Sequence, residues 1–307
     1  SVITRDDSLS TKSSYGIGAY RFITITNCIV KNSHHGISVC GEEFEISNVI
    51  LTNIIVGCSF CSTISSDIGR LTNANIVVKR RNGAPWQPSA TTWVDYGTFH
   101  IDRLTALNII PLGETGVTNS TFQKGGSLVN SSITNFWSTC IWASAKSNNQ
   151  YLIENSILNG YGYGVEMLGP NLKVFNTVLL NNKDAGIRIY DPYTGDYNLY
   201  FNNGKTGTGT NYYQGEHDII ANPMFVNATE HQLYPPVTEF DYHLQYGSPA
   251  IDAGAPWLLD ADGSRSDIGV FGGPGGSSYP YQDLPPLAPK WISSKVENKT
   301  VTLKWKK

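Results

Sequence analysis

Two pentapeptides in the middle of the chain decide the fold: Ile153-Glu154-Asn155-Ser156-Ile157 and Val174-Phe175-Asn176-Thr177-Val178. Both read apolar-x-Asn-x-apolar, and their asparagines are 21 positions apart. The same pattern surrounds Asn27 and Asn48, which are also 21 positions apart. Looser copies surround Asn75, Asn108, Asn130 and Asn198. The sequence is therefore organised as a repeat of 21 to 22 residues.

A second pattern follows each asparagine after nine or ten residues. Examples are Gly36-Ile37-Ser38-Val39, Gly164-Val165-Glu166-Met167 and Gly186-Ile187-Arg188-Ile189. Apolar and polar residues alternate in these segments, as they do in a strand that buries one face. Each repeat is thus predicted to contain two short strands at a fixed separation.

A unit this short cannot bury its own apolar face, so it must stack on copies of itself. We predict an all-β fold, a right-handed parallel β-helix with coils of about 21 to 22 residues, closed by a C-terminal segment. The asparagines are expected to stack as a ladder inside the coils, where they would satisfy one another's polar atoms. A leucine-rich repeat also has an asparagine ladder, but its leucine framework and helical segment are missing here.

Composition narrows the class of protein. The 307 residues are 40% apolar, which is enough to build a core. The chain has 22 basic and 25 acidic residues, so it has no positive electrostatic field that would attract nucleic acid. No apolar run is long enough to span a membrane. The chain starts without Met and without a signal-peptide core, which we interpret as a mature product. Tyr, Trp, Ser, Thr, Asn and Gly are abundant, as in β-rich extracellular proteins.

The last third of the chain loses the repeat and resembles a known family. The resemblance is carried by Ala221-Asn222-Pro223-Met224-Phe225, Tyr242-His243-Leu244, Gly247 to Gly254, Asp260-Ala261-Asp262-Gly263 and Arg265 to Phe271. This succession resembles the closing segment of secreted right-handed β-helix repeat proteins in the pectate-lyase-like superfamily. The resemblance implies an extracellular or cell-surface location. It does not fix the activity, because the superfamily includes lyases, hydrolases, epimerases and adhesins.

Two domains are expected. Residues 1–283 form the β-helix with its closing segment, and residues 284–307 form a linker and two strands that resemble the start of a fibronectin type III domain. Two strands alone are marginal in water, so the parent polypeptide is expected to be longer. Neighbouring domains or partner subunits would then contact the ends of the coils.

Outward residues of stacked strands form columns, and one column runs through Trp142, Glu166 and Arg188. Its companion runs through Cys40, Cys61, Ser144, Leu168 and Tyr190. An aromatic ring, a carboxylate and a guanidinium in one line could bind a sugar, because Arg forms bidentate hydrogen bonds with a uronate carboxylate. We name Glu166 and Arg188 as candidate catalytic residues, and Trp142 and Tyr190 as candidate substrate-binding residues. The alternative is an exposed ion pair beside a chance Trp.

Catalysis would need more than this column. Lyases of this fold generally use Ca²⁺ with a Lys or Arg base, and hydrolases use two or three carboxylates. Further groups could come from Asp67, His100, Asp102, Asp191 and Asp196, although none of them forms a recognisable motif. Asp260, Asp262 and Asp267 resemble part of a Ca²⁺ loop, and the alternative is a structural role in which Arg265 neutralises Asp252 or Asp267.

The segment from Lys79 to Tyr96 breaks the coil spacing, because Asn75 and Asn108 are 33 positions apart, and it is predicted to be a loop. Arg80, Trp86 and Trp93 make it a candidate ligand wall, or alternatively the Trp rings pack the loop onto the solenoid. Cys40 and Cys61 should lie in adjacent coils, either as a disulfide or as two stacked thiols. The leading hypothesis is an extracellular domain that recognises a polysaccharide. The sequence does not decide whether the domain also cleaves the polysaccharide. The rival is a non-catalytic adhesin or surface scaffold.

Overall fold

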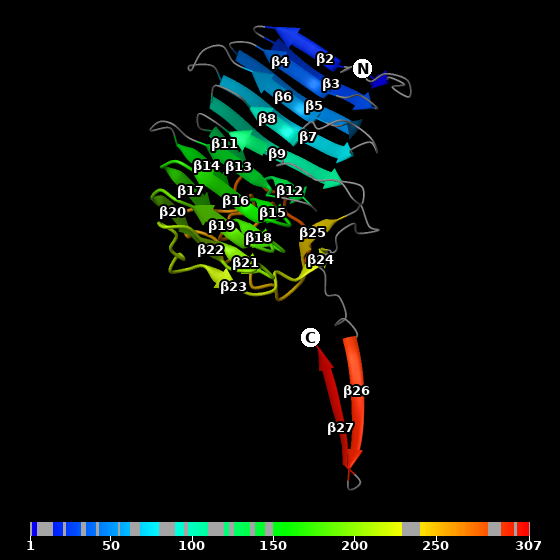
Figure 1. Ribbon diagram of the computed structural model, residues 1–307, viewed down its shortest axis with the longest axis vertical. Helices are drawn as coiled ribbons and strands as arrows, with labels where there is room; N and C mark the ends of the chain where they lie inside the picture. The colour runs from blue at the N-terminus through cyan, green and yellow to red at the C-terminus, as the bar shows by residue number, and fades with distance from the viewer. Residues whose placement is uncertain are drawn as a thin grey trace.

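A computed structural model of the chain describes most of the repeat. The described residues are 2–4, 15–20, 23–31, 35–40, 43–54, 56–61, 68–79, 90–94, 98–109, 120–122, 126–135, 139–144, 150–228, 240–281, 290–297 and 300–306. Within these ranges every regular element is a strand. Successive coils stack as a parallel β-solenoid, which confirms the predicted fold class (Figure 1).

The larger sheet has 14 strands, and its pairs are parallel and follow the coil repeat. Its main path is β1 (Val2–Thr4), β3 (Ile23–Lys31), β5 (Glu43–Ile54), β7 (Ile68–Lys79), β9 (Thr98–Ile109), β12 (Ser132–Asn135), β15 (Ile157–Asn159), β18 (Val178–Leu180), β21 (Leu199–Phe201) and β23 (Ile219–Ile220). A branch continues from β9 through β11 (Gly126–Val129), β14 (Tyr151–Glu154), β17 (Leu172–Phe175) and β20 (Tyr193–Asp196).

The second sheet has nine parallel strands, one for each coil that it crosses. They are β2 (Tyr15–Tyr20), β4 (His35–Cys40), β6 (Val56–Cys61), β8 (Ala90–Val94), β10 (Ser120–Phe122), β13 (Ile141–Ser144), β16 (Tyr163–Leu168), β19 (Ala185–Ile189) and β22 (Gly207–Thr208). β8 corrects one prediction. Residues 79–96 were expected to form a loop throughout, yet Ala90–Val94 pair with β6 and β10.

The core lies between the sheets and is built by alternation along each strand. In β16, Val165 and Met167 are buried while Glu166 between them is only half-buried. The next coil repeats this arrangement with Ile187 and Ile189 on either side of Arg188. Burying a Val, Ile or Leu side chain contributes roughly 1.5–3 kcal/mol. Apolar side chains at equivalent positions of successive coils therefore pack on one another. This packing supplies most of the folding stability that a single coil lacks.

The asparagines of the repeat have a different role from the one predicted. Asn27, Asn48, Asn130, Asn155 and Asn176 all adopt positive φ, between 45° and 54°. They form the corner at which each coil bends, because Asn tolerates the left-handed conformation better than most residues. Asn27 and Asn48 are exposed at this corner, so the ladder does not lie inside the coil there.

The polar column inside the coils starts one residue later. It consists of buried Ser131, Ser156, Thr177 and Asn198. The main-chain amide of Thr177 donates to Asn198 Oδ1 over 3.1 Å, and the amide of Ser131 donates to Ser156 Oγ over 3.3 Å. This column therefore satisfies main-chain groups that bend away from the sheet at each corner.

The described residues of the closing segment, 221–228 and 240–281, pack on the outer side of the larger sheet. It includes β24 (Phe225–Asn227) and β25 (Asp241–Leu244), an antiparallel pair beside β15 and β18 (Figure 1). Its Phe225, Tyr242 and Leu244 share an apolar cluster with Ile157 and Val178 of the coils. The larger sheet is thus buried on both faces where this segment covers it.

The closing segment also covers the later asparagine corners. Asn130 Nδ2 donates to the Gly272 carbonyl over 2.8 Å. Asn176 Oδ1 accepts from the amide of Ala255 over 2.7 Å, and Asn176 Nδ2 donates to Ser266 Oγ over 3.4 Å. These contacts explain why the same residue type is exposed in the first coils and buried in the later ones.

The C-terminal hairpin is made of β26 (Lys290–Glu297) and β27 (Thr300–Lys306), which pair antiparallel. The two strands expected from the sequence are therefore present. Their sheet contains no strand of the solenoid, and Figure 1 shows the hairpin extending beyond it. The boundary proposed at residue 283 lies in 282–289, outside the described residues.

Candidate functional site

The predicted outward column is confirmed by the register of the nine-stranded sheet. Trp142 pairs with Glu166, and Glu166 pairs with Arg188. Arg188 pairs in turn with Thr208 of β22. We call the three residues Trp142, Glu166 and Arg188 the Arg188 column. Its members come from three successive coils, so their spacing is fixed by the stacking of the strands, about 4.8 Å per coil.

Glu166 and Arg188 form an ion pair on this face. Arg188 Nη1 lies 3.2 Å from Glu166 Oε1, and the side chains are 34% and 19% exposed for Arg188 and Glu166. Two tyrosines hold the guanidinium from the sides. Arg188 Nε donates to the Tyr190 hydroxyl over 2.6 Å, and Nη1 donates to the Tyr163 hydroxyl over 3.3 Å. The guanidinium also lies about 5 Å from both tyrosine ring centroids.

The site is thus a preorganised polar and aromatic surface. Burial raises the pKa of Glu166, whereas the charge of Arg188 lowers it and the charge of Asp184 raises it. Asp184 therefore lies near enough to influence Glu166, and it is exposed at the start of β19. Sequence reasoning missed Tyr163 and Asp184, although Tyr163 belongs to the same strand as Glu166.

Three further residues were assigned to the ligand wall. Trp93 pairs with Ser59 and with Thr121, and Thr121 pairs with Trp142, so Trp93 stands on the line of the Arg188 column two coils earlier. This register position replaces the loop position predicted for it. Arg80 and Trp86 lie outside the described residues.

The residues proposed as metal ligands serve as hydrogen-bond acceptors within the closing segment. Asp260 accepts from the amides of Asp267 and Gly273. Asp262 accepts from the amide and hydroxyl of Ser264. Asp267 accepts from the amide of Asp252 over 2.9 Å and from Tyr281. Among the described residues, no group of three His, Cys, Asp or Glu side chains could hold a metal ion.

Arg265 does not play the neutralising role expected of it. Its Nε donates to the carbonyl of Gly254 over 2.6 Å, and its Nη2 donates to the carbonyl of Ala253 over 3.3 Å. Its guanidinium lies 5.7 Å from the ring centroid of Tyr197. Arg265 therefore ties the closing segment to a coil corner.

Three of the other candidate acids and bases lie on the larger sheet and not on the sheet of the Arg188 column. His100 and Asp102 are on β9 of the larger sheet, where Asp102 pairs with Arg103 at 2.9 Å. Asp196 ends β20 of the same sheet. Asp191 lies just after β19, and Asp67 is outside the described residues. The structure thus places His100, Asp102 and Asp196 on a different sheet from Arg188.

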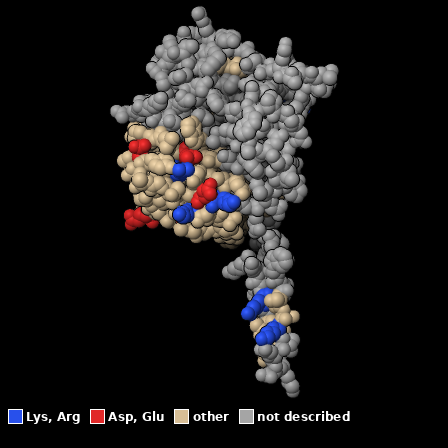
Figure 2. Space-filling model, in the orientation of Figure 1, with Lys and Arg blue, Asp and Glu red and all other residues tan. Residues whose placement is uncertain are grey.

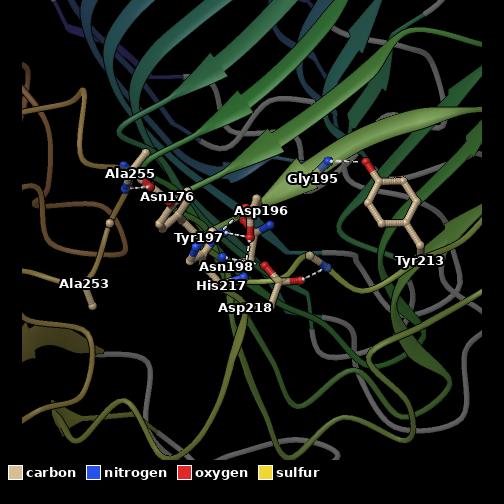
Figure 3. Close-up of polar contacts among 12 residues, drawn as sticks. Asn176, Gly195, Asp196, Tyr197, Asn198, Tyr213, His217, Asp218, Ala253 and Ala255 are labelled. Carbon is tan, nitrogen blue, oxygen red and sulfur yellow. Dashed lines mark hydrogen bonds and ion pairs between the residues drawn. The ribbon is translucent and has the colours of Figure 1, made fainter.

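A second polar cluster, which the sequence did not reveal, surrounds Asp196 at the end of β20 (Figure 3). Asp196 Oδ2 lies 2.8 Å from His217 Nδ1, and its Oδ1 accepts from the amides of Tyr197 and His217. Nearby, Asp218 accepts from the amides of Asn198 and Gly215. These carboxylates fix the loop at 215–218 to the last full coil.

Charge is mixed on the part of the surface seen in Figure 2, where acidic and basic side chains are interspersed over the described coils.

The register also places Cys40 opposite Cys61, as expected, whereas their side chains lie outside what is described. The part of the chain that the structure describes contains no helix with the length and hydropathy needed to cross a membrane. No protein-family model, no curated protein and no solved structure matches the chain.

Proposed function

We propose that this chain is a secreted β-helix domain of the pectate-lyase-like type that recognises a polysaccharide on the nine-stranded sheet. The observation that carries this proposal is the Arg188 guanidinium, which is held by Glu166 and lies against Tyr163 and Tyr190. Aromatic rings cover the C–H faces of sugars, and a fixed Arg fork binds carboxylates or paired hydroxyls. A polysaccharide chain lying along the coils would meet Trp142 on the same line.

Recognition is better supported than cleavage. Glu166 is the carboxylate of the column, and its partner Arg188 neutralises it. Hydrolysis of a glycosidic bond uses two carboxyl groups at a defined separation. Asp184 would have to act as the second of these groups beside Glu166. The non-catalytic adhesin is therefore the alternative. The antiparallel pair of β26 and β27 supports the proposal that these strands belong to a domain of fibronectin type III character.

The proposal is tested by measuring binding and turnover together. The wild-type protein is titrated with polygalacturonate, alginate, xylan and cellulose fragments, with and without Ca²⁺, while reducing ends and unsaturated products are followed. We expect Arg188→Ala to weaken binding at least tenfold, about 1.4 kcal/mol, because both the cation and its fork are lost. Arg188→Lys should give an intermediate affinity, since it keeps only the charge.

Lys173→Ala is the matched control, because Lys173 is an exposed cation on β17 of the other sheet. Its affinity should equal that of the wild type. Equal binding by Arg188→Ala and wild type, with unchanged thermal unfolding, would show that the ligand site lies elsewhere. Release of products by the wild type would add an enzymatic activity to the proposal.

A further inference from the structure

A second surface, on the larger sheet, presents rigidly held aromatic and polar groups to solvent. We call it the Tyr197 cluster, and its members are Asp196, Tyr197, His217, Trp257 and Arg265. They come from β20, from the loop that follows β22 and from the closing segment. The Arg188 column lies on the other sheet, so the two surfaces are separate.

Tyr197 organises this cluster from an unusual position. It has a φ of 57° and takes the corner position that Asn176 occupies one coil earlier. A large side chain is disfavoured in this conformation, so the fold holds the Tyr197 ring there at a cost in backbone energy. The ring stacks on His217 at 4.5 Å between centroids and 3° between planes. It is nearly buried, whereas the groups around it are not.

Trp257 provides an exposed aromatic face. It meets the Tyr197 ring edge-on at 5.5 Å and the Phe175 ring edge-on at 6.0 Å. Despite these two contacts, the residue is 65% exposed. An indole that packs against two rings and still keeps 65% of the residue's surface in water is available to stack on a sugar ring.

His217 and Arg265 bring polar groups to the same place. The His217 side chain is 50% exposed, although its Nδ1 and its main-chain amide are both held by Asp196. The hydrogen bond to Asp196 raises the pKa of His217, whereas the charge of Arg265 lowers it. Arg265 is fixed through main-chain carbonyls. Both side chains are therefore oriented before any ligand arrives, which lowers the entropic cost of binding.

We propose that Trp257, His217 and Arg265 form a second carbohydrate site, which binds one pyranose ring by stacking on the indole and by hydrogen bonds to its hydroxyls. Asp196 and Tyr197 are positioning residues that hold the imidazole ring. This inference rests on the proposed function in that it takes the ligand to be a sugar. It adds that the domain holds two sugars, one on each sheet, and that the second site survives loss of the first.

The test uses the full chain and measures affinity and stoichiometry by calorimetry. The probes are hexagalacturonate and hexamannuronate as acidic sugars, and cellohexaose and xylohexaose as neutral ones. In the Arg188→Ala background we expect residual binding of at least one probe at one site per chain. Adding Trp257→Ala should weaken it at least tenfold, and adding His217→Gln should weaken it about threefold. Adding Tyr246→Ala, which removes another exposed aromatic of the closing segment, should leave it unchanged.

Asp196→Asn provides a readout for positioning. We expect it to lower the pKa of His217 and to change the population of the imidazole tautomers, both measured by ¹⁵N NMR, while reducing affinity. Unchanged residual binding in Trp257→Ala would overturn the second site. If Arg188→Ala alone abolishes all binding, the second site is wrong and the proposed function stands. If Trp257→Ala abolishes binding and Arg188→Ala does not, the second site is right and the Arg188 column is not the ligand site.

Discussion

Replacing Asn176 with alanine is expected to lower the free energy of unfolding by about 3 kcal/mol. The side chain is fully buried and joins a coil corner to the closing segment through Ala255 and Ser266. Removing it leaves the buried amide of Ala255 without its acceptor, which costs about 1–3 kcal/mol. Forcing alanine to a φ of 49° adds about 1 kcal/mol.

Asn48→Ala is the matched control for this change. Asn48 has nearly the same φ, 53°, but is exposed and accepts a single hydrogen bond from Asn73 over 3.1 Å. Its replacement should cost about 1 kcal/mol, mostly through the backbone. Asn176→Gly separates the two contributions, since glycine accepts the conformation but makes neither hydrogen bond. Urea unfolding and hydrogen exchange at the Ala255 amide measure the effects. Equal losses in Asn176→Ala and Asn48→Ala would show that the contacts with the closing segment contribute nothing.

Asp267→Asn is expected to stabilise the protein at neutral pH, with an advantage that grows between about pH 4 and pH 6. The pKa of Asp267 is raised to about 6, mainly by burial and also by the carboxylates of Asp260 and Asp252, while hydrogen bonds from the Asp252 amide and the Tyr281 hydroxyl lower it. Since the folded state holds its proton up to a higher pH than the unfolded state, the wild type loses stability as pH rises through this window. A shift from 3.8 to about 6 corresponds to about 3 kcal/mol.

The asparagine variant avoids this loss because it does not titrate. Its amide has the shape of the carboxyl group, and its oxygen can still accept from the amide of Asp252. Asp262→Asn serves as the control of opposite sign, because hydrogen bonds from Ser264 lower the pKa of that exposed carboxyl. Its relative stability should fall as pH rises. Thermal unfolding of the three proteins from pH 2 to pH 8 measures both differences, because the Asp262 difference develops below about pH 4 and the Asp267 difference above it. A constant difference between Asp267→Asn and wild type would contradict the raised pKa of Asp267.

The repeat alone was sufficient to predict the coil. A period of 21 residues at Asn27 and Asn48, and again at Asn155 and Asn176, requires stacking, because no single unit can bury its apolar face. Stacking fixes the register, and the register makes Glu166 and Arg188 neighbours. The ion pair at 3.2 Å therefore follows from positions 22 residues apart in the sequence.

The asparagines show where a correct pattern was given the wrong role. Their spacing is the same whether the side chain points into the coil or forms its corner, so period alone cannot distinguish the two. The backbone distinguishes them, since Asn176 has positive φ while Asn198, one residue out of phase with Asn176, lies in the buried column instead. In that coil Tyr197 takes the corner position and Asn198 takes the buried position. The spacing of the asparagines did not indicate that Tyr197 would replace Asn at the corner.

The amino-acid sequence by itself determined the solenoid, the register of its strands and the line from Trp142 to Arg188, because each depends on residues at a constant separation. Only the tertiary structure decided what lies outside the coils. Trp257 and Arg265 reach Tyr197 from a segment about 60 residues away that has no repeat. Contacts between segments without a common period depend on how the whole closing segment packs, and that packing is set by buried area and not by any local pattern.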